Sequence, residues 1–236
     1  MNLFELFVKI GVDDQASGKL SDLSSKLGNG LKTAAKIGTA AVGAAAAGIT
    51  ALTKAAVDNY AEYEQLVGGV ETLFKDSAKT VIENASKAYT TAGMSANEYM
   101  ETVTSFSASL LQSLGNDTAA AADKADMAIT DMSDNANKMG TSMEMIQNAY
   151  QGFAKQNYTM LDNLKLGYGG TKEEMQRLLA DAEKISGIKY DISSYADIVD
   201  AIHVVQNEMG ITGTTAKEAS STISGSLSSM KGAWQN

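Results

Sequence analysis

The sequence lacks several residues on which common protein functions depend. It has no Cys and no Pro, and among 236 residues it has one His and one Arg. Without Cys, disulfide scaffolds and thiol chemistry are excluded. Proline interrupts helices, so its absence indicates long helical stretches, which the abundance of Ala also favours. The single imidazole (His203) and guanidinium (Arg177) leave little for imidazole catalysis, metal binding or phosphate recognition. The composition therefore argues against an enzyme.

The charge is negative and unevenly distributed. The formal net charge is −9, and residues 58–160 carry six Lys against fourteen acidic residues. Such a body repels the backbone of nucleic acids, so we expect no sequence-specific nucleic-acid binding. The first residues, MNLFELFVKIGVDD, place acids in and after a short apolar run, unlike the basic start of a signal peptide. We therefore expect synthesis in a cytoplasm.

The first fifty-seven residues contain two distinct patterns. Residues 3–12 alternate apolar and polar side chains, which predicts one short N-terminal β-strand. Residues 37–53 are then a run of seventeen uncharged residues, rich in Ala and Gly. A membrane span usually needs ~20 mostly apolar residues, so this run fits either a helix packed closely through small residues or a segment that inserts in a membrane under some conditions. Under both interpretations the candidate contact residues are Val42, Gly43, Gly48, Ile49 and Leu52.

After Lys54 the chain has the pattern of successive helices. Polar residues followed three positions later by an acid are typical of helix N-termini. Five such pairs occur: Ser95/Glu98, Thr141/Glu144, Thr171/Glu174, Ser194/Asp197 and Thr215/Glu218. Between them run apolar residues at helical spacing: Tyr99, Val103, Phe106, Leu110 and Leu114, and later Ile198, Ile202, Val205 and Met209. The predicted fold class is all-α, with several Ala- and Met-rich helices and the short N-terminal strand.

One apolar stripe has strict three–four spacing and is a candidate helix-packing surface. Its members are Ala122, Ala125, Ile129, Met132, Ala136 and Met139. The stripe spans about two and a half heptads, whereas a coiled coil needs three or four. Met and Ala at such positions suit helices that repack between two states, and they equally suit an ordinary helical core.

Two glycine clusters are expected to interrupt helices. One is Gly68-Gly69, and the other is Gly167, Tyr168, Gly169 and Gly170, a candidate hinge loop directly before the Thr171 cap. The second cluster is similar to a phosphate-binding loop only superficially. It lacks the Lys-Ser/Thr pair that would reach a phosphate and Mg²⁺.

Paired acids and the single His are the remaining candidates for chemistry. The pairs are Asp131 with Asp134, Glu173 with Glu174, and Asp197 with Asp200. Acids at such spacing on amphipathic helices usually lie on solvated faces, and catalysis would require shifted pKa values. His203 has neither Cys nor a second His with which to build a zinc site, so we expect it to be partly buried with one hydrogen bond. We assign no catalytic, metal-binding or cofactor-binding residue.

Three stretches carry a resemblance that composition does not explain. They are AEYEQLVGGVETLF at 61–74, DMSDNANKMG at 131–140 and AYQGFAKQNYTMLDNLKLGYGGTKEEM at 149–175. Together they resemble the core region of bacteriophage tail tape measure proteins, found in long-tailed phages and in phage-tail-like particles of Gram-positive bacteria. The resemblance extends over roughly residues 55–190.

The resemblance implies a structural protein. Members of the family occupy the lumen of the phage tail in several copies, set tail length during assembly and leave ahead of the DNA at infection. The implied partners are the tail tube protein, tail assembly chaperones, tail-tip proteins, further copies of the chain as a homo-oligomer, and the host membrane. The implied location is the virion. The alternative is a membrane-active helical protein that inserts through residues 37–53.

The predicted organisation has three parts. Residues 1–57 hold the strand and the Ala/Gly-rich segment, 58–190 form the helical core, and 191–236 form C-terminal helices. A last apolar stripe runs from Ala216 to Trp234 without a helix stop signal. We therefore expect these helices to continue in a longer protein.

Overall fold

The computed structural model describes residues 61–221. The predicted strand at 3–12 and the Ala/Gly-rich segment at 37–53, with Val42, Gly43, Gly48, Ile49 and Leu52, lie outside the described residues. The chain divides into two compact units, Met1–Ala61 and Glu62–Asn236.

The described residues are mostly helical and contain no strand, which confirms the all-α prediction for this part of the chain. Residues 61–74 are helical and lead into a short 3-10 helix, η1 (Lys75–Ser77). The remaining elements are α4 (Ala78–Thr91), α5 (Ala96–Ser113), α6 (Thr118–Met139), α7 (Met143–Phe153), η2 (Leu161–Leu164), α8 (Lys172–Ser186), α9 (Tyr195–Glu208) and α10 (Thr214–Ser221).

Three of the predicted helix starts are confirmed. The hydroxyl of Ser95 accepts the backbone N–H of Glu98, and the Glu98 carboxylate accepts the backbone N–H of Ser95 in return. Thr171 caps α8 and Ser194 caps α9 through their hydroxyls, each accepting the backbone N–H of the acid three positions later. These local contacts satisfy backbone donors that the first helical turn leaves without partners.

Two predicted starts are wrong. The cap of α7 is Ser142, one residue after Thr141, because the Thr141 hydroxyl instead donates to the carbonyl of Asn163, 3.0 Å away. Thr215 lies inside α10, which begins at Thr214. In both cases a contact with a residue distant in sequence replaces the local cap.

The predicted break at Gly68-Gly69 is also wrong, because both glycines lie within helical residues 61–74. A β-carbon built on Gly69 would lie 3.7 Å from Cγ2 of Thr104, so Gly69 faces α5 across a contact between helices. The backbone of Gly69 can remain helical there because packing outweighs the modest helical penalty of glycine.

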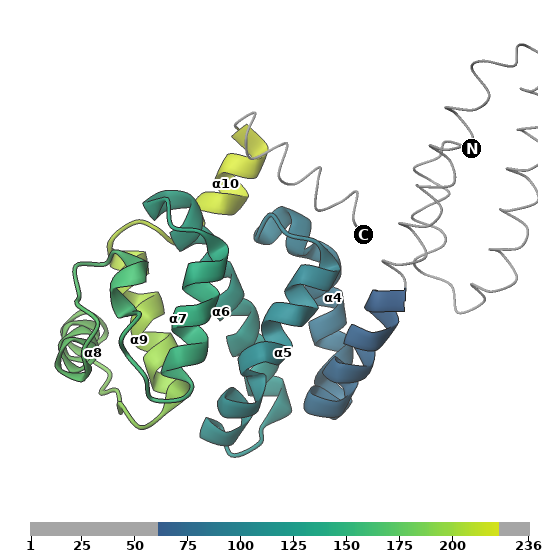
Figure 1. The fold of residues 1–236 in the computed structure, drawn as a ribbon, viewed down its shortest axis with the longest axis horizontal. Helices are drawn as coiled ribbons and strands as arrows, with labels where there is room; N and C mark the ends of the chain where they lie inside the picture. The colour runs from purple at the N-terminus through teal and green to yellow at the C-terminus, as the bar shows by residue number, and fades with distance from the viewer. Residues whose placement is uncertain (1–60, 222–236) are drawn as a thin grey trace, which may run out of the picture. The chain divides into compact units, whose positions relative to one another are not determined.

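Helix α6 lies at the centre of this unit (Figure 1). It contacts α4, α5, α7, α9 and α10, while α8 packs mainly against α9. The largest fully buried side chains come from most of these elements: Phe74, Tyr99, Met100, Leu110, Ile129, Met132, Ile146, Tyr150, Phe153, Leu161, Leu164 and Met175. Because helices cover α6 on several sides, polar residues on more than one of its faces become buried.

Candidate functional site

The candidate site is a polar cluster in the C-terminal half of α6, within the stretch 131–140. We call Asp131, Ser133, Asp134 and Asn135 the α6 polar cluster. All four are buried, with Asp134 and Asn135 at 0% relative exposure. The prediction that Asp131 and Asp134 lie on a solvated face is therefore wrong. The physical reason is the central position of α6, which leaves residues 131–135 without a face turned to solvent.

Asp134 binds the start of α10. Its two carboxylate oxygens accept the backbone N–H groups of Gly213, at 2.6 Å, and Thr215, at 2.7 Å. A helix N-terminus has N–H groups without partners and a partial positive charge, both of which a carboxylate satisfies. Asp134 thus caps α10 although it lies about eighty residues away in sequence. This contact fixes α10 on α6.

Asn135 and Ser133 connect α6 to other segments. The Asn135 side chain donates to the Leu164 carbonyl at 3.0 Å and to the Gln206 side chain at 2.9 Å. The Ser133 hydroxyl donates to the carbonyl of Ala92, at the end of α4, over 2.7 Å. Together with Asp134, these residues join α4, η2, α9 and α10 to one helix.

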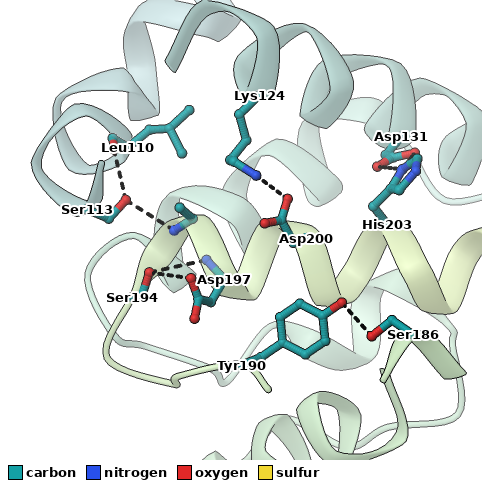
Figure 2. Close-up of polar contacts among 11 residues, drawn as sticks. Leu110, Ser113, Lys124, Asp131, Ser186, Tyr190, Ser194, Asp197, Asp200 and His203 are labelled. Atoms are coloured by element: carbon teal, nitrogen blue, oxygen red, sulfur yellow. Dashed lines mark hydrogen bonds and ion pairs between the residues drawn. The ribbon is translucent and has the colours of Figure 1, made fainter. Parts of the chain in front are cut away.

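Two ionic contacts join α6 to α9 on the same side (Figure 2). Asp131 accepts from Nδ1 of His203, with its carboxylate oxygens 2.8 and 3.0 Å away. Lys124, two turns earlier on α6, pairs with Asp200 on α9. Adding the Asn135–Gln206 hydrogen bond, we call these three pairs the α6–α9 polar seam. Residue numbers increase in the same direction along both helices, so the seam fixes a parallel register.

Burial has opposing effects on the Asp131–His203 pair. It raises the pKa of Asp131, since a carboxylate without water is costly, and the hydrogen bond and charge of His203 partly offset this. The hydrogen bond to Asp131 raises the pKa of His203 above its ordinary value of 6.5. The His203 side chain is 33% exposed and its partner 1%, which confirms the expectation of a partly buried, hydrogen-bonded imidazole.

Buried polar atoms around the seam complete the description of the site. Within residues 61–221, five buried side-chain atoms have no hydrogen-bond partner: Oδ1 of Asn135, the hydroxyls of Tyr150, Tyr195 and Thr212, and Nε2 of Gln206. Burial raises the pKa of Tyr150, and the charge of Asp131 raises it further. Burial also raises the pKa of Tyr195, so the phenols of Tyr150 and Tyr195 are both kept protonated. In the described part of the chain, no group of three His, Cys, Asp or Glu residues is placed to hold a metal ion.

The predicted hinge loop, Gly167 to Gly170, lies between η2 and α8 and is held by many contacts. Arg177 stacks on the Tyr168 ring, 4.2 Å from its centroid, and donates to the Gly167 carbonyl at 2.7 Å. The Glu174 carboxylate accepts from the backbone N–H of Gly169 at 2.9 Å. Its hydrogen bonds with Arg177 lower the pKa of Glu174 to about 2. The loop thus interrupts the helices as predicted, while a hinge motion remains a prediction.

Gly170 allows a close approach of two backbone segments. A β-carbon at this position would lie 2.2 Å from the carbonyl oxygen of Thr159, well inside van der Waals contact. Tyr168, within the same glycine run, is also held by a hydrogen bond, because its hydroxyl donates to Asp181 over 3.1 Å. Burial, followed by the hydrogen bond to Asp181, raises the pKa of Tyr168 to about 12.

The candidate packing stripe lies on α6 beside the polar cluster. Ala122, Ala125, Ile129 and Met132 are buried in the core, and Ala136 and Met139 are partly buried against it. The α9 stripe behaves similarly for its first three members, whereas Met209 is 46% exposed at the helix end. The prediction that Met209 belongs to the buried stripe is therefore wrong, because α9 ends at Glu208.

Several residues that hold the site were not identified from the sequence. Gln206 is fully buried on α9 and binds Asn135, and Lys165 donates to the Met139 carbonyl at 3.0 Å. Lys165 adopts a left-handed backbone conformation with φ of 52°, which is uncommon for a lysine. A polar residue inside an apolar stripe, as at Gln206 between Val205 and the helix end, is the signal that could have identified one of them.

Over residues 61–221, no helix combines the length and the apolar character needed to cross a bilayer. Comparison of the chain with models of known protein families, with curated proteins and with solved structures finds no match.

Proposed function

We propose that this chain is part of a phage tail tape measure protein, a structural protein that fills the tail tube, sets tail length during assembly and leaves at infection. Two of the three stretches that carry the resemblance, 131–140 and 149–175, meet in the folded chain. The Asn135 side chain donates to the Leu164 carbonyl, and the Lys165 side chain donates to the Met139 carbonyl. Thr141, the residue directly after the first stretch, donates its hydroxyl to the Asn163 carbonyl. This meeting of the two stretches is the observation that supports the proposal best.

The character of the site is also consistent with a structural role. Ser133, Asp134 and Asn135 at its centre bind backbone and side-chain partners from α4, η2, α9 and α10. Such an arrangement holds helices in register.

The proposal is tested on particles made by the phage or the bacterium that encodes the chain. Mass spectrometry of purified tails should detect peptides from residues 61–221, and a tagged chain should co-purify with the tail tube protein of the same genome. A matched control is a tagged cytoplasmic helical protein of similar size and charge. Purified tails without these peptides, together with no co-purification above the control, would contradict the proposal.

The alternative role in a membrane is supported by the uncharged run at 37–53. The test is dye leakage from liposomes caused by the whole chain, compared with a variant carrying Val42→Asp and Ile49→Asp. If the membrane role is correct, the original chain should cause leakage and the variant little, since two charged side chains within the bilayer oppose insertion. No leakage with either protein would reject the membrane role and leave the structural proposal untouched.

A further inference from the structure

The Asp131–His203 pair connects two helices that are distant in sequence, and its members differ in access to water. The two residues are seventy-two positions apart, and their closest atoms are 2.8 Å apart. The carboxylate side chain is 1% exposed, while the imidazole is 33% exposed. A proton can therefore leave His203 for solvent, but water cannot hydrate Asp131 unless α9 moves away from α6.

Other charged groups around the pair are already engaged. Lys124 of α6 pairs with Asp200 of α9, and this ion pair lies beside His203 (Figure 2). Asp134, also on α6, accepts two backbone N–H groups from the start of α10. Tyr150 of α7 carries a buried phenol without a hydrogen-bond partner, and burial followed by the charge of Asp131 raises its pKa, which keeps it neutral. Among the described residues, His203 is thus the cation in direct contact with Asp131.

Loss of the imidazole proton changes the balance at this contact. A buried carboxylate next to a cation is partly compensated, whereas a buried carboxylate next to a neutral ring loses this compensation. The folded chain raises the pKa of His203, so the stabilisation is complete below pH 6.5 and is lost as the pH rises through the raised value. The raised pKa of Asp131 acts in the same direction, because it too favours the folded state at lower pH.

We propose that the Asp131–His203 pair is a pH-sensitive latch that holds α9 on α6 while the imidazole is protonated and loosens this contact when the proton is lost. The latch would act on α8 as well, because α8 packs mainly against α9. It does not depend on the role of the chain in a phage tail. It is a property of the contacts between these helices.

The whole chain provides an unambiguous probe, because His203 is its single histidine. NMR titration of the imidazole gives its pKa directly, and we expect a value above 6.5. Hydrogen exchange, corrected for the intrinsic effect of pH, then compares α9 with α4 between pH 6 and pH 9. The protection of α9 relative to α4 should fall by about tenfold for each pH unit by which the His203 pKa exceeds 6.5.

Two variants on α6 form a matched pair for this experiment. Asp131→Asn removes the charge of the latch, so the ratio of α9 to α4 protection should no longer depend on pH. Asp123→Asn makes the same chemical change at an exposed position and should behave like the original chain. A His203 pKa at or below 6.5, or an unchanged ratio in the original chain, overturns the proposal. The same holds if Asp131→Asn keeps the pH dependence.

Discussion

Two networks of charged and polar side chains in this protein use similar chemical groups in different surroundings. The α6 polar cluster is buried, and its hydrogen bonds reach residues as far as eighty-two positions away. The second network consists of Tyr168, Glu174, Arg177 and Asp181 around the start of α8, and its contacts span at most thirteen positions. Its ionic groups lie largely at the surface.

The difference indicates what each network contributes. Removing one partner from a buried polar pair leaves another polar group without water, which costs more than the bond itself contributes. An exposed ion pair replaces contacts with water by a contact within the protein, so it contributes little to the free energy of unfolding. We therefore expect the α6 polar cluster to hold distant segments of the fold together, and the α8 network to shape one loop.

The largest effect is expected for Asp134→Ala. This change leaves the backbone N–H groups of Gly213 and Thr215 without their charged acceptor and should lower the free energy of unfolding by about 3 kcal/mol. Urea denaturation followed by circular dichroism gives the value. Asp123→Ala, on the exposed side of the same helix, should change it by less than about 0.5 kcal/mol. Equal effects at the two positions would contradict the comparison.

Asn135→Ala should follow, with a loss of about 2 kcal/mol. The change leaves the Leu164 carbonyl and the Gln206 side chain without their donor in a buried place. Thermal unfolding should show a fall in Tm of roughly 6 °C. Asn137→Ala, two residues further along and exposed, is the matched control and should shift Tm by no more than about 2 °C. A larger shift for Asn137→Ala than for Asn135→Ala would reverse the proposed ranking.

Gly170→Ala sharpens the comparison, because it tests the one crowded place in the loop of the α8 network. The added β-carbon would meet the Thr159 carbonyl, so one backbone segment must move, at a cost of about 1.5 kcal/mol. Gly68→Ala is the control: it lies in a helix with free space around the new carbon and should be stabilising by about 0.5–1 kcal/mol. Both changes in the free energy of unfolding are measured by urea denaturation. If Gly170→Ala leaves this free energy unchanged, the loop backbone moves at little cost, which contradicts the expectation.

The smallest effect is expected for Glu174→Gln. The hydrogen bonds with Arg177 lower the pKa of Glu174 to about 2, so its contribution to stability is present above pH 4.5 and is lost as the pH falls toward 2. The difference in Tm between the original chain and the variant should be smaller than for the buried substitutions and should vanish near pH 2. Glu173→Gln, at the neighbouring exposed position, serves as the control. A difference in Tm that grows toward low pH would contradict the expected pH dependence of the Glu174 contribution.

Local features of the fold could be predicted from the sequence. Caps such as Ser95 and Ser194 act on backbone groups three residues away, so their effect is contained in a short segment. The apolar stripes of α5 and α6 likewise depend on helical periodicity, and most of their members are buried. These predictions succeeded because the interactions that decide them lie within a few turns of one helix.

Features that depend on contacts between distant segments could not be predicted. Periodicity assigns one buried face to a helix, whereas α6 is covered by five other helices, so Asp131 and Asp134 are buried on faces that were expected to be solvated. The sequence identified Asp131, Asp134 and His203 as residues of interest. It could not show that one carboxylate binds the imidazole and the other the start of α10, because those partners lie more than seventy residues away.

The proposed function is structural, with the chain acting as part of a ruler for tail length. The most direct test is the length of tails, measured by electron microscopy, in particles whose gene for this protein carries in-frame deletions outside residues 61–221. We predict shorter tails in proportion to the deletion, by about 1.5 Å for each residue removed from a continuous helix. Tails of unchanged length over a series of such deletions would contradict the claim.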